Sequence, residues 1–395
     1  LLGIIGFVLT GVGLPLLAIL ACSKGNGTFE SITNKISPKF TLILTTVLFF
    51  AIGPLLAIPR TAATTFEMSI LPLTSSLNSI VFSIIFFILT FILTIKQTKV
   101  MDIIGKFLTP VLLIALILLI GKGILYPIGE LSNNDNNGLF INGITQGYQT
   151  MDALGIGGVT TLIMTSFVAK GYKDKKENIS MTLKSATVAG IGLVIIYGGL
   201  AYLGSTVSTI YDASISQTTL LVNITNSLLG KSGIMLLGII VAFACLTTAI
   251  GLTSITAKYF EDVSNKKLKY SHLVSFICIF SAIASNLGVD KIIAIAVPIL
   301  TVIYPVSILL IVMSIFSKHL KSQSIFKGAA FATLFISLLN VANSLGVNIV
   351  FLNKLPLASL GFNWVIPAII GGILGKVLIK NNKKDKKINF LSFLY

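Results

Sequence analysis

Long apolar runs separated by short polar stretches dominate the chain. Two typical runs, 40–58 and 292–316, are apolar almost throughout and show no alternation with polar positions. The hydrocarbon core of a bilayer is about 30 Å thick, so a helix needs about 20 mainly apolar residues to cross it. Strands of a membrane barrel would instead show alternating segments of about ten residues. The pattern therefore predicts helices that span a membrane.

Eleven such segments can be counted. They cover approximately residues 1–22, 40–58, 77–95, 103–125, 139–169, 184–204, 231–255, 271–287, 292–316, 326–345 and 362–380. Inside a bilayer every backbone polar group needs an internal partner, and a helix supplies these partners within one segment. We therefore expect an all-α integral membrane protein with about 11 transmembrane helices, in which residues 1–395 form a single polytopic domain.

Composition supports a membrane location. Of the 395 residues, 54% are hydrophobic and only 11% are charged, whereas a soluble domain carries about 25% charged residues. A soluble core could not hide this much apolar surface, but lipid can cover it. We therefore expect membrane lipid to surround the chain.

The basic residues, which give the chain a net charge of +16, fall mostly on one side of the predicted membrane. When the connections are taken alternately, one set contains only five of the 29 lysines and arginines, namely Arg60, Lys122, Lys231, Lys291 and Lys354. An excess of Lys and Arg marks cytoplasmic loops. The Lys-rich tail, 381–395, is therefore expected in the cytoplasm. The basic residues are topology signals, so we expect no nucleic-acid partner.

This orientation places Leu1 outside, because an odd number of crossings separates it from the tail. The chain begins there with an apolar run that has neither a Met nor a charged flank. We expect at least one helix upstream of Leu1, so that the sequence is truncated at its N-terminus. A cleaved signal peptide is the alternative explanation.

Motifs for catalysis or metal binding are missing from the sequence. It contains no Ser-His-Asp set, no cluster with metal-ligand spacing and no glycine-rich phosphate loop. The cysteines, Cys22, Cys245 and Cys278, lie in separate apolar runs and are interpreted as packing residues. We therefore expect no catalytic residues, no cofactor and no resident metal.

The run 147–158 places a carboxylate, Asp152, inside an apolar segment. The glycines at 155, 157 and 158 are expected to weaken the helix just after it and to free backbone groups. An ionisable residue at membrane depth is costly and is by default a functional candidate. Broken helices expose backbone groups to substrates near the bilayer midplane. One interpretation is a broken helix that lines a substrate pocket; the other is a kinked helix with Asp152 near the outer interface. The substrate-binding candidates are Tyr148, Thr150, Asp152, Ala153, Gly155 and Gly157.

A second run, 245–254, carries the hydroxyls of Thr247, Thr248 and Ser254 in an apolar segment. Hydroxyl oxygens suit Na⁺ beside backbone carbonyls, so these three residues are candidate ion ligands. Threonines in a membrane helix also commonly donate to the carbonyl of the preceding turn. The residues alone favour this second, structural explanation.

The third run, 53–67, combines Pro54, Pro59, Arg60 and Glu67. The two prolines are expected to kink or terminate the helix. Arg60, the sole arginine of the chain, would then lie on the outer side, with Glu67 as the natural partner for an ion pair. These four residues are gate or structural candidates, and direct contact of Arg60 with substrate is left open.

Several stretches together resemble the bacterial branched-chain amino acid:cation symporter (LIVCS) family of the amino acid–polyamine–cation superfamily. They are Gly-Pro-Leu-Leu-Ala-Ile-Pro-Arg-Thr-Ala at 53–62 with Phe66-Glu67 after it, the run 9–17, and 147–153. The resemblance implies twelve spans with two inverted five-helix repeats. The eleven segments would then be family helices 2 to 12, with helix 1 missing. Segment 139–169 would be the broken helix 6, and 231–255 would be helix 8.

The resemblance also implies a function. The Leu-Thr-Thr pattern at 246–248 looks like the sodium site that related carriers build between helices 1 and 8, which favours Thr247 and Thr248 as ligands, with Ser254 as a further candidate. We expect a secondary transporter that takes up leucine, isoleucine and valine by alternating access, coupled to Na⁺ or H⁺, in a bacterial cell membrane. The alternatives are a carrier of another amino acid or small solute, a membrane-embedded enzyme, and a channel. The oligomeric state is left open.

Overall fold

Helices make up the regular structure of every described part of the chain. The computed structural model describes residues 2–25, 27–74, 76–95, 100–131, 138–212, 214–317, 320 and 322–378, and these ranges contain no strand. The all-α prediction is thereby confirmed for them. The predicted cytoplasmic tail, 381–395, lies outside the described residues.

The apolar helices follow the predicted segments closely. In chain order the first half contains α1 (Leu2–Val8), η1 (Leu9–Gly13), α2 (Leu14–Lys24), α3 (Glu30–Thr33), α4 (Pro38–Phe50), η2 (Ala51–Leu55), α5 (Ala57–Thr65), η3 (Phe66–Ile70), α6 (Ser79–Ile95), α7 (Val100–Leu125) and α8 (Leu139–Tyr148). The second half contains α9 (Asp152–Ala169), α10 (Lys175–Thr206), α11 (Gln217–Val263), α12 (Tyr270–Ser285), α13 (Val289–Ile315), α14 (Gln323–Ser344), α15 (Phe351–Lys354), η4 (Ala358–Leu360) and α16 (Val365–Leu378).

By length and composition, seven helical stretches of the described chain are able to cross a membrane, and four shorter apolar helices accompany them. Each of the eleven predicted segments falls on one of these helices. The number of actual crossings and the inverted repeat stay predictions.

Large apolar side chains cover the outside of the bundle. On α6, Ile84 and Ile85 are 49% and 56% exposed, and on α10 and α12, Val188 and Ile283 are each 72% exposed. Soluble proteins rarely expose contiguous apolar patches of this kind. We expect lipid to cover these faces.

The second predicted segment, 40–58, is longer than expected, and its predicted end at position 58 is wrong. Helical structure continues from Pro38 to Ile70, interrupted at η2, where Gly53 has φ −87° and ψ −121°. Pro54 lies in this interruption, and Pro59 lies in the first turn of α5. A proline is tolerated in a first turn because the N–H groups there have no helical partner. Arg60 therefore lies inside this helical stretch and not at its end.

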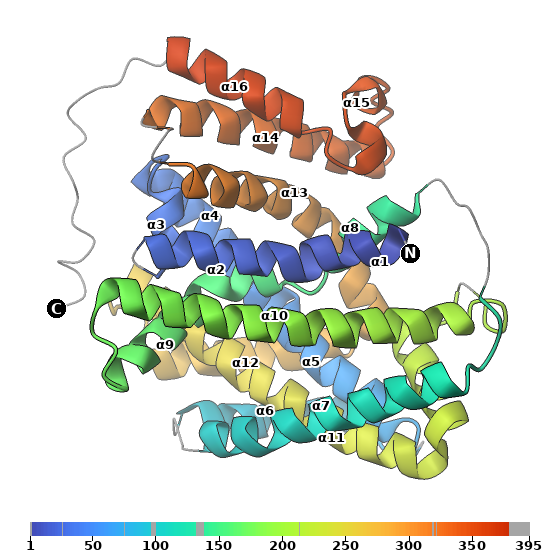
Figure 1. Ribbon diagram of the computed structural model, residues 1–395. Helices are drawn as coiled ribbons and strands as arrows, with labels where there is room; N and C mark the ends of the chain where they lie inside the picture. Colours follow the sequence, from blue (N-terminus) through green and yellow to red (C-terminus); the bar gives the residue numbers. More distant parts are fainter. Residues whose placement is uncertain are drawn as a thin grey trace.

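Glycines set two close helix crossings. A Cβ atom on Gly143 of α8 would overlap the carbonyl oxygen of Gly3 on α1, and one on Gly147 would overlap the hydroxyl of Thr10. A similar crossing joins α14 to α16, which lie stacked along one edge of the molecule (Figure 1). Small residues allow the backbones of membrane helices to approach in this way. The first crossing places α8 against the helix that α1, η1 and α2 form.

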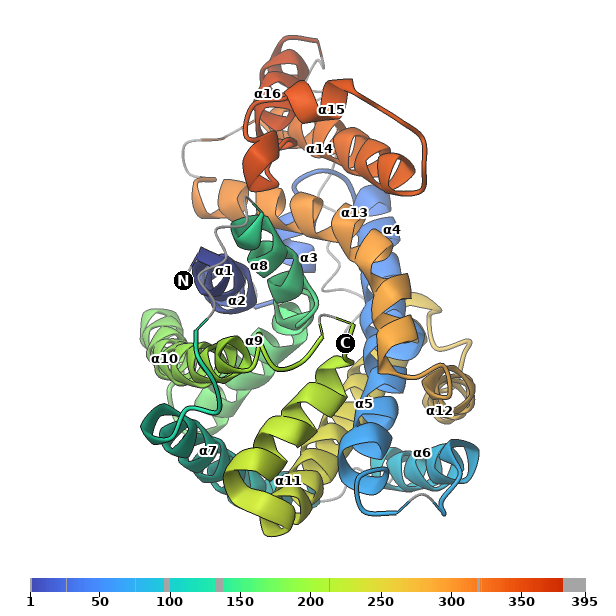
Figure 2. The same cartoon turned by 90° about the vertical axis from the view of Figure 1, so that its right-hand side faces the viewer.

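Helices from distant parts of the chain surround the centre of the bundle (Figure 2). Figure 2 shows α2, α9 and α10 on one side of the centre, α5 on the other side, and α11 below it. In α11 the chain bends at Gly230, which has φ +67° and so adopts a conformation that other residues rarely take. This bend directs the remainder of α11, which carries residues 244–255, past the centre of the bundle.

Candidate functional site

The predicted segment 139–169 is broken in the middle of the bundle. Helix α8 ends at Tyr148 and α9 begins at Asp152, and between them Met151 adopts a left-handed conformation with φ +58°. A non-glycine residue with positive φ is uncommon and is often found at functional sites. The side chain of Thr150 stabilises this turn, because its hydroxyl donates to the Gly147 carbonyl (3.0 Å). A break was predicted in this stretch, and the structure places it at 149–151.

The glycines after Asp152 do not cause the break, contrary to the prediction from sequence. Gly155, Gly157 and Gly158 all lie inside α9. Gly157 serves a close contact instead, because a Cβ there would lie 2.8 Å from the backbone nitrogen of Phe29. A Cβ on Gly155 would meet no heavy atom within 4 Å, so this glycine leaves open space beside α9.

That open space belongs to a cavity of about 1020 Å³ at the centre of the bundle. Its walls come mainly from α2, α5, the break at 149–151, α9, α10 and α11. Ligand pockets in proteins typically measure about 300–1,000 Å³. The cavity is therefore large enough to hold an amino acid together with an ion or water.

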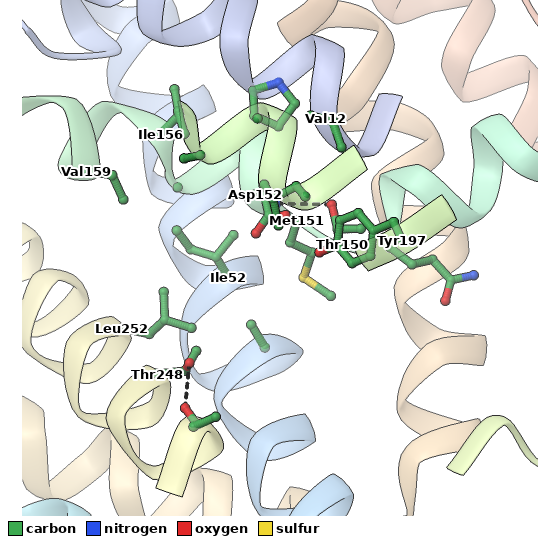
Figure 3. A pocket seen from close by; sticks show the side chains of 18 of the residues that line it. Val12, Ile52, Thr150, Met151, Asp152, Ile156, Val159, Tyr197, Thr248 and Leu252 are labelled. Carbon is green, nitrogen blue, oxygen red and sulfur yellow. Dashed lines mark hydrogen bonds between the residues drawn. The ribbon is translucent and has the colours of Figure 1, made fainter. Parts of the chain in front are cut away.

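Polar and apolar side chains divide the cavity between them. Figure 3 shows Asp152 between the apolar side chains of Ile156, Val159 and Leu252 on one side and Thr150 and Tyr197 on the other. The same order holds along the helices. On α5 and η2, Arg60, Thr61 and Thr64 follow the apolar Ile52 and Ala57, and on α11, Thr248 precedes Leu252 and Ile255. One end of the cavity is thus mainly polar and the other mainly apolar.

Arg60 reaches the break from the opposite wall. Its Nη1 atom donates to the carbonyl oxygen of Gln149 at 2.9 Å. The backbone carbonyls released where a helix is interrupted need such partners inside a membrane protein. Arg60 thereby holds α5 against the break, and its side chain lines the cavity beside it.

The ion pair expected between Arg60 and Glu67 is not formed in the described structure. Glu67 accepts a hydrogen bond from the Thr218 hydroxyl (2.5 Å) and another from the Val289 backbone nitrogen (2.9 Å). It lies on η3, about two turns beyond Arg60 along the span. The carboxylate therefore joins η3 to the first turns of α11 and α13. The expectation was wrong because the helix continues past Pro59 and separates the two charges.

The structure brings together three of the six predicted substrate-binding residues. Thr150, Asp152 and Gly155 line the cavity. Tyr148, Ala153 and Gly157 do not. Tyr148 faces away from it and stacks on Tyr304 of α13, with ring centroids 4.4 Å apart. Ala153 is 1% exposed and packs in the core.

Of the predicted ion ligands, only Thr248 lines the cavity. The Thr247 hydroxyl donates to the carbonyls of Phe243 and Ala244, and the Thr248 hydroxyl donates to Ala244 (2.9 Å). Ser254 accepts a hydrogen bond from the Tyr270 hydroxyl instead (3.1 Å). The back-bonding pattern is thus present in both threonines, and Thr248 alone also faces the open space.

Several polar residues of the cavity were not singled out from the sequence, namely Thr61, Thr64, Gln146, Gln149, Ser185, Tyr197 and Gln217. Gln146 and Gln149 carried a usable signal, because two amides three residues apart in an apolar run lie on one helix face. Tyr197 is one aromatic residue within a long apolar segment, and its sequence context carries no such signal.

Comparison with known proteins identifies similar chains along the whole length. A family model described as branched-chain amino acid transport protein matches residues 1–382. The branched-chain amino acid permease BrnQ of Bacillus subtilis is 32% identical over 94% of this chain and 88% of its own. BraB, a second branched-chain amino acid permease of Bacillus subtilis, is 35% identical over 98% of this chain and 90% of its own. A putative branched-chain amino acid carrier protein of Staphylococcus haemolyticus is 34% identical over 97% and 90%.

Among solved structures, a Na⁺-coupled sialic acid symporter in a substrate-bound, outward-open state matches 96% of this chain and 89% of its own. The sequence identity is 15% and the TM-score is 0.49.

Proposed function

The chain belongs to the branched-chain amino acid transport protein family, and we propose that it is a secondary transporter that takes up leucine, isoleucine and valine together with Na⁺. Its relatives are named as permeases and carriers, so the chain is a transporter and not an enzyme. Family and apolar helices together make it a multi-pass protein of the cell membrane. A cytoplasmic C-terminus is part of the proposal and is supported by the distribution of lysines.

The observation that carries the proposal is the division of the cavity. A branched-chain amino acid has a zwitterionic end and a hydrocarbon end, and the cavity offers a polar part at Asp152 and the break beside an apolar part at Ile156, Val159 and Leu252. One methylene group changes binding in an apolar pocket by only about 1–3 kcal/mol. Such a pocket is therefore expected to accept all three substrates.

We place the coupling ion near Thr248. Its hydroxyl oxygen lies on the cavity wall, and a hydroxyl that donates to Ala244 still has lone pairs to offer a cation. Ion and substrate would then share one cavity. Coupling follows if both stabilise the same conformation, because a ligand shifts an equilibrium only through its different affinities for the two states.

Transport by alternating access requires segments whose orientation changes during the cycle. Two interrupted spans line the cavity, 38–70 with its break at Gly53 and 139–169 with its break at 149–151. Positions that depart from helical geometry can absorb such a change as hinges. In the proposed cycle these breaks allow the cavity to open first to the outside and then to the cytoplasm.

Uptake of radiolabelled leucine into proteoliposomes that contain the complete gene product tests the proposal. We expect saturable uptake driven by an inward Na⁺ gradient and reduced by unlabelled isoleucine and valine. An H⁺ gradient without Na⁺ serves as the comparison. Absence of saturable leucine uptake under either gradient would rule out the substrate assignment, and uptake driven by H⁺ alone would rule out Na⁺ as the coupling ion.

Thr248→Ala is expected to weaken Na⁺ coupling. Loss of one oxygen ligand should raise the Na⁺ concentration for half-maximal uptake about tenfold or more, since an interaction with a charged group is worth about 1.5–3 kcal/mol. Thr248→Ser retains the oxygen and should behave like the wild type. Thr247→Ala is the matched control, because Thr247 makes the same backbone hydrogen bond but lies outside the cavity. Equal Na⁺ dependence of both alanine variants would show that Thr248 is not a ligand of the coupling ion.

A further inference from the structure

Two side chains carry all the formal charge on the described cavity wall. Arg60 projects from α5 and Asp152 from the first turn of α9, and the other lining residues are neutral. The two do not form an ion pair, since the salt bridges of the described chain join Lys258 to Glu261 and Asp262. The cavity thus contains one positive and one negative group that do not neutralise each other.

Unneutralised charges inside a bundle of apolar helices are unfavourable, and a ligand that carries both charges would compensate both. Charged groups inside membrane spans generally pair with each other or mark a substrate pathway. Arg60 uses one donor of its guanidinium on the Gln149 carbonyl, and a guanidinium has five N–H donors in a planar fork. The fork matches a carboxylate, which it binds through two parallel hydrogen bonds.

We propose that Arg60 binds the α-carboxylate of the substrate and that Asp152 binds its α-ammonium group, so that the cavity recognises an amino acid by both charges. This inference rests on the proposed function and adds the residues that select for the zwitterion. The alternative, a carboxylate at the N-terminus of α9, would bring two negative charges together at Asp152. With the ends placed as proposed, the side chain extends toward Ile156 and Val159.

Competition against labelled leucine tests the inference with two analogues of the same shape. 3-Methylbutylamine lacks the carboxylate, and 4-methyl-2-oxopentanoate lacks the ammonium group. In the wild type we expect both to compete about ten- to a hundredfold more weakly than leucine, because each loses one interaction with a charged group. Competition by either analogue at the strength of leucine would overturn the inference, while leucine uptake itself would leave the proposed function intact.

Variants distinguish the two roles from a merely structural one. Asp152→Asn should weaken the binding of leucine and bring the affinity for 4-methyl-2-oxopentanoate to within a few-fold of that for leucine. The reason is that this variant has no carboxylate at position 152 to repel the oxo acid. Arg60→Gln should weaken the binding of leucine and leave the binding of 3-methylbutylamine unchanged. Arg60→Lys retains the positive charge but not the planar fork of donors, so its affinity for leucine should lie between those of the wild type and Arg60→Gln. A general defect would weaken all ligands alike and would overturn the inference.

The outcomes also separate this inference from the function on which it rests. If the wild type shows no saturable leucine uptake, the proposed function fails. If the wild type transports leucine and Arg60→Gln keeps the wild-type KM for it, the function stands and the role of Arg60 fails. If a variant does not fold, competition by the two analogues in the wild type still shows whether the cavity binds both the carboxylate and the ammonium group of the substrate.

Discussion

Replacement of Gly155 by leucine is expected to abolish leucine uptake while the protein stays folded. Gly155 lines the central cavity, and a Cβ built on it meets no heavy atom within 4 Å. The new side chain therefore has room, but it occupies space that the substrate needs. Uptake in proteoliposomes gives the functional result, and size-exclusion chromatography in detergent shows whether the variant is folded.

The size of the new side chain should matter at this position. Gly155→Ala is expected to reduce transport of leucine and isoleucine more than that of valine, because it removes space for about one methyl group from a pocket where each methylene is worth about 1–3 kcal/mol. Gly192→Leu is the matched control, since Gly192 lies on α10 with open space around its Cβ position and outside the cavity lining. Wild-type leucine uptake by a folded Gly155→Leu variant would place the substrate elsewhere.

Gly143→Leu should prevent the bundle from assembling. A Cβ there overlaps the backbone carbonyl of Gly3, and backbone atoms on both helices cannot move aside as a side chain can. Inserting methylene groups into a well-packed core already costs about 1–3 kcal/mol. Separation of α1 from α8 would also break the hydrogen bond that the Thr10 hydroxyl donates to the Ile144 carbonyl. The expected result is loss of the monodisperse peak in detergent.

The control for this effect is again Gly192→Leu, which adds the same side chain to an apolar helix without such a contact. It should retain the monodisperse peak of the wild type. A Gly143→Leu variant that elutes and melts like the wild type would show that α1 and α8 do not cross as closely as described. Because α8 leads into the break at 149–151, this crossing also positions the cavity wall.

The sequence predicted the helices and the location of the site better than its detailed geometry. Apolar length and the presence of an ionisable residue are properties of single segments, so the apolar helices and the position of Asp152 inside one of them could be predicted directly. The break itself depends on the left-handed conformation of Met151, and nothing in a methionine signals it. The glycines that suggested a break at 155–158 serve close packing and open space instead.

The other differences have a common physical cause. Which face of a helix is turned to the cavity depends on the packing of the whole bundle. On α11 the cavity face carries Thr248 and Leu252, four residues apart, and this rotation leaves Thr247 on another face. Likewise, Pro54 and Pro59 marked a disturbance of the helix, but only the structure shows that the helix resumes and brings Arg60 to the break.

Protection of a native cysteine tests the central claim, that the cavity holds the amino acid, most directly. Cys245 lines the cavity, whereas Cys22 and Cys278 are 0% and 4% exposed and pack in the core. Modification of Cys245 by a maleimide, followed residue by residue with mass spectrometry, should slow in the presence of leucine and Na⁺ and should not respond to lysine. A modification rate that leucine leaves unchanged, in protein that transports leucine, would contradict the account.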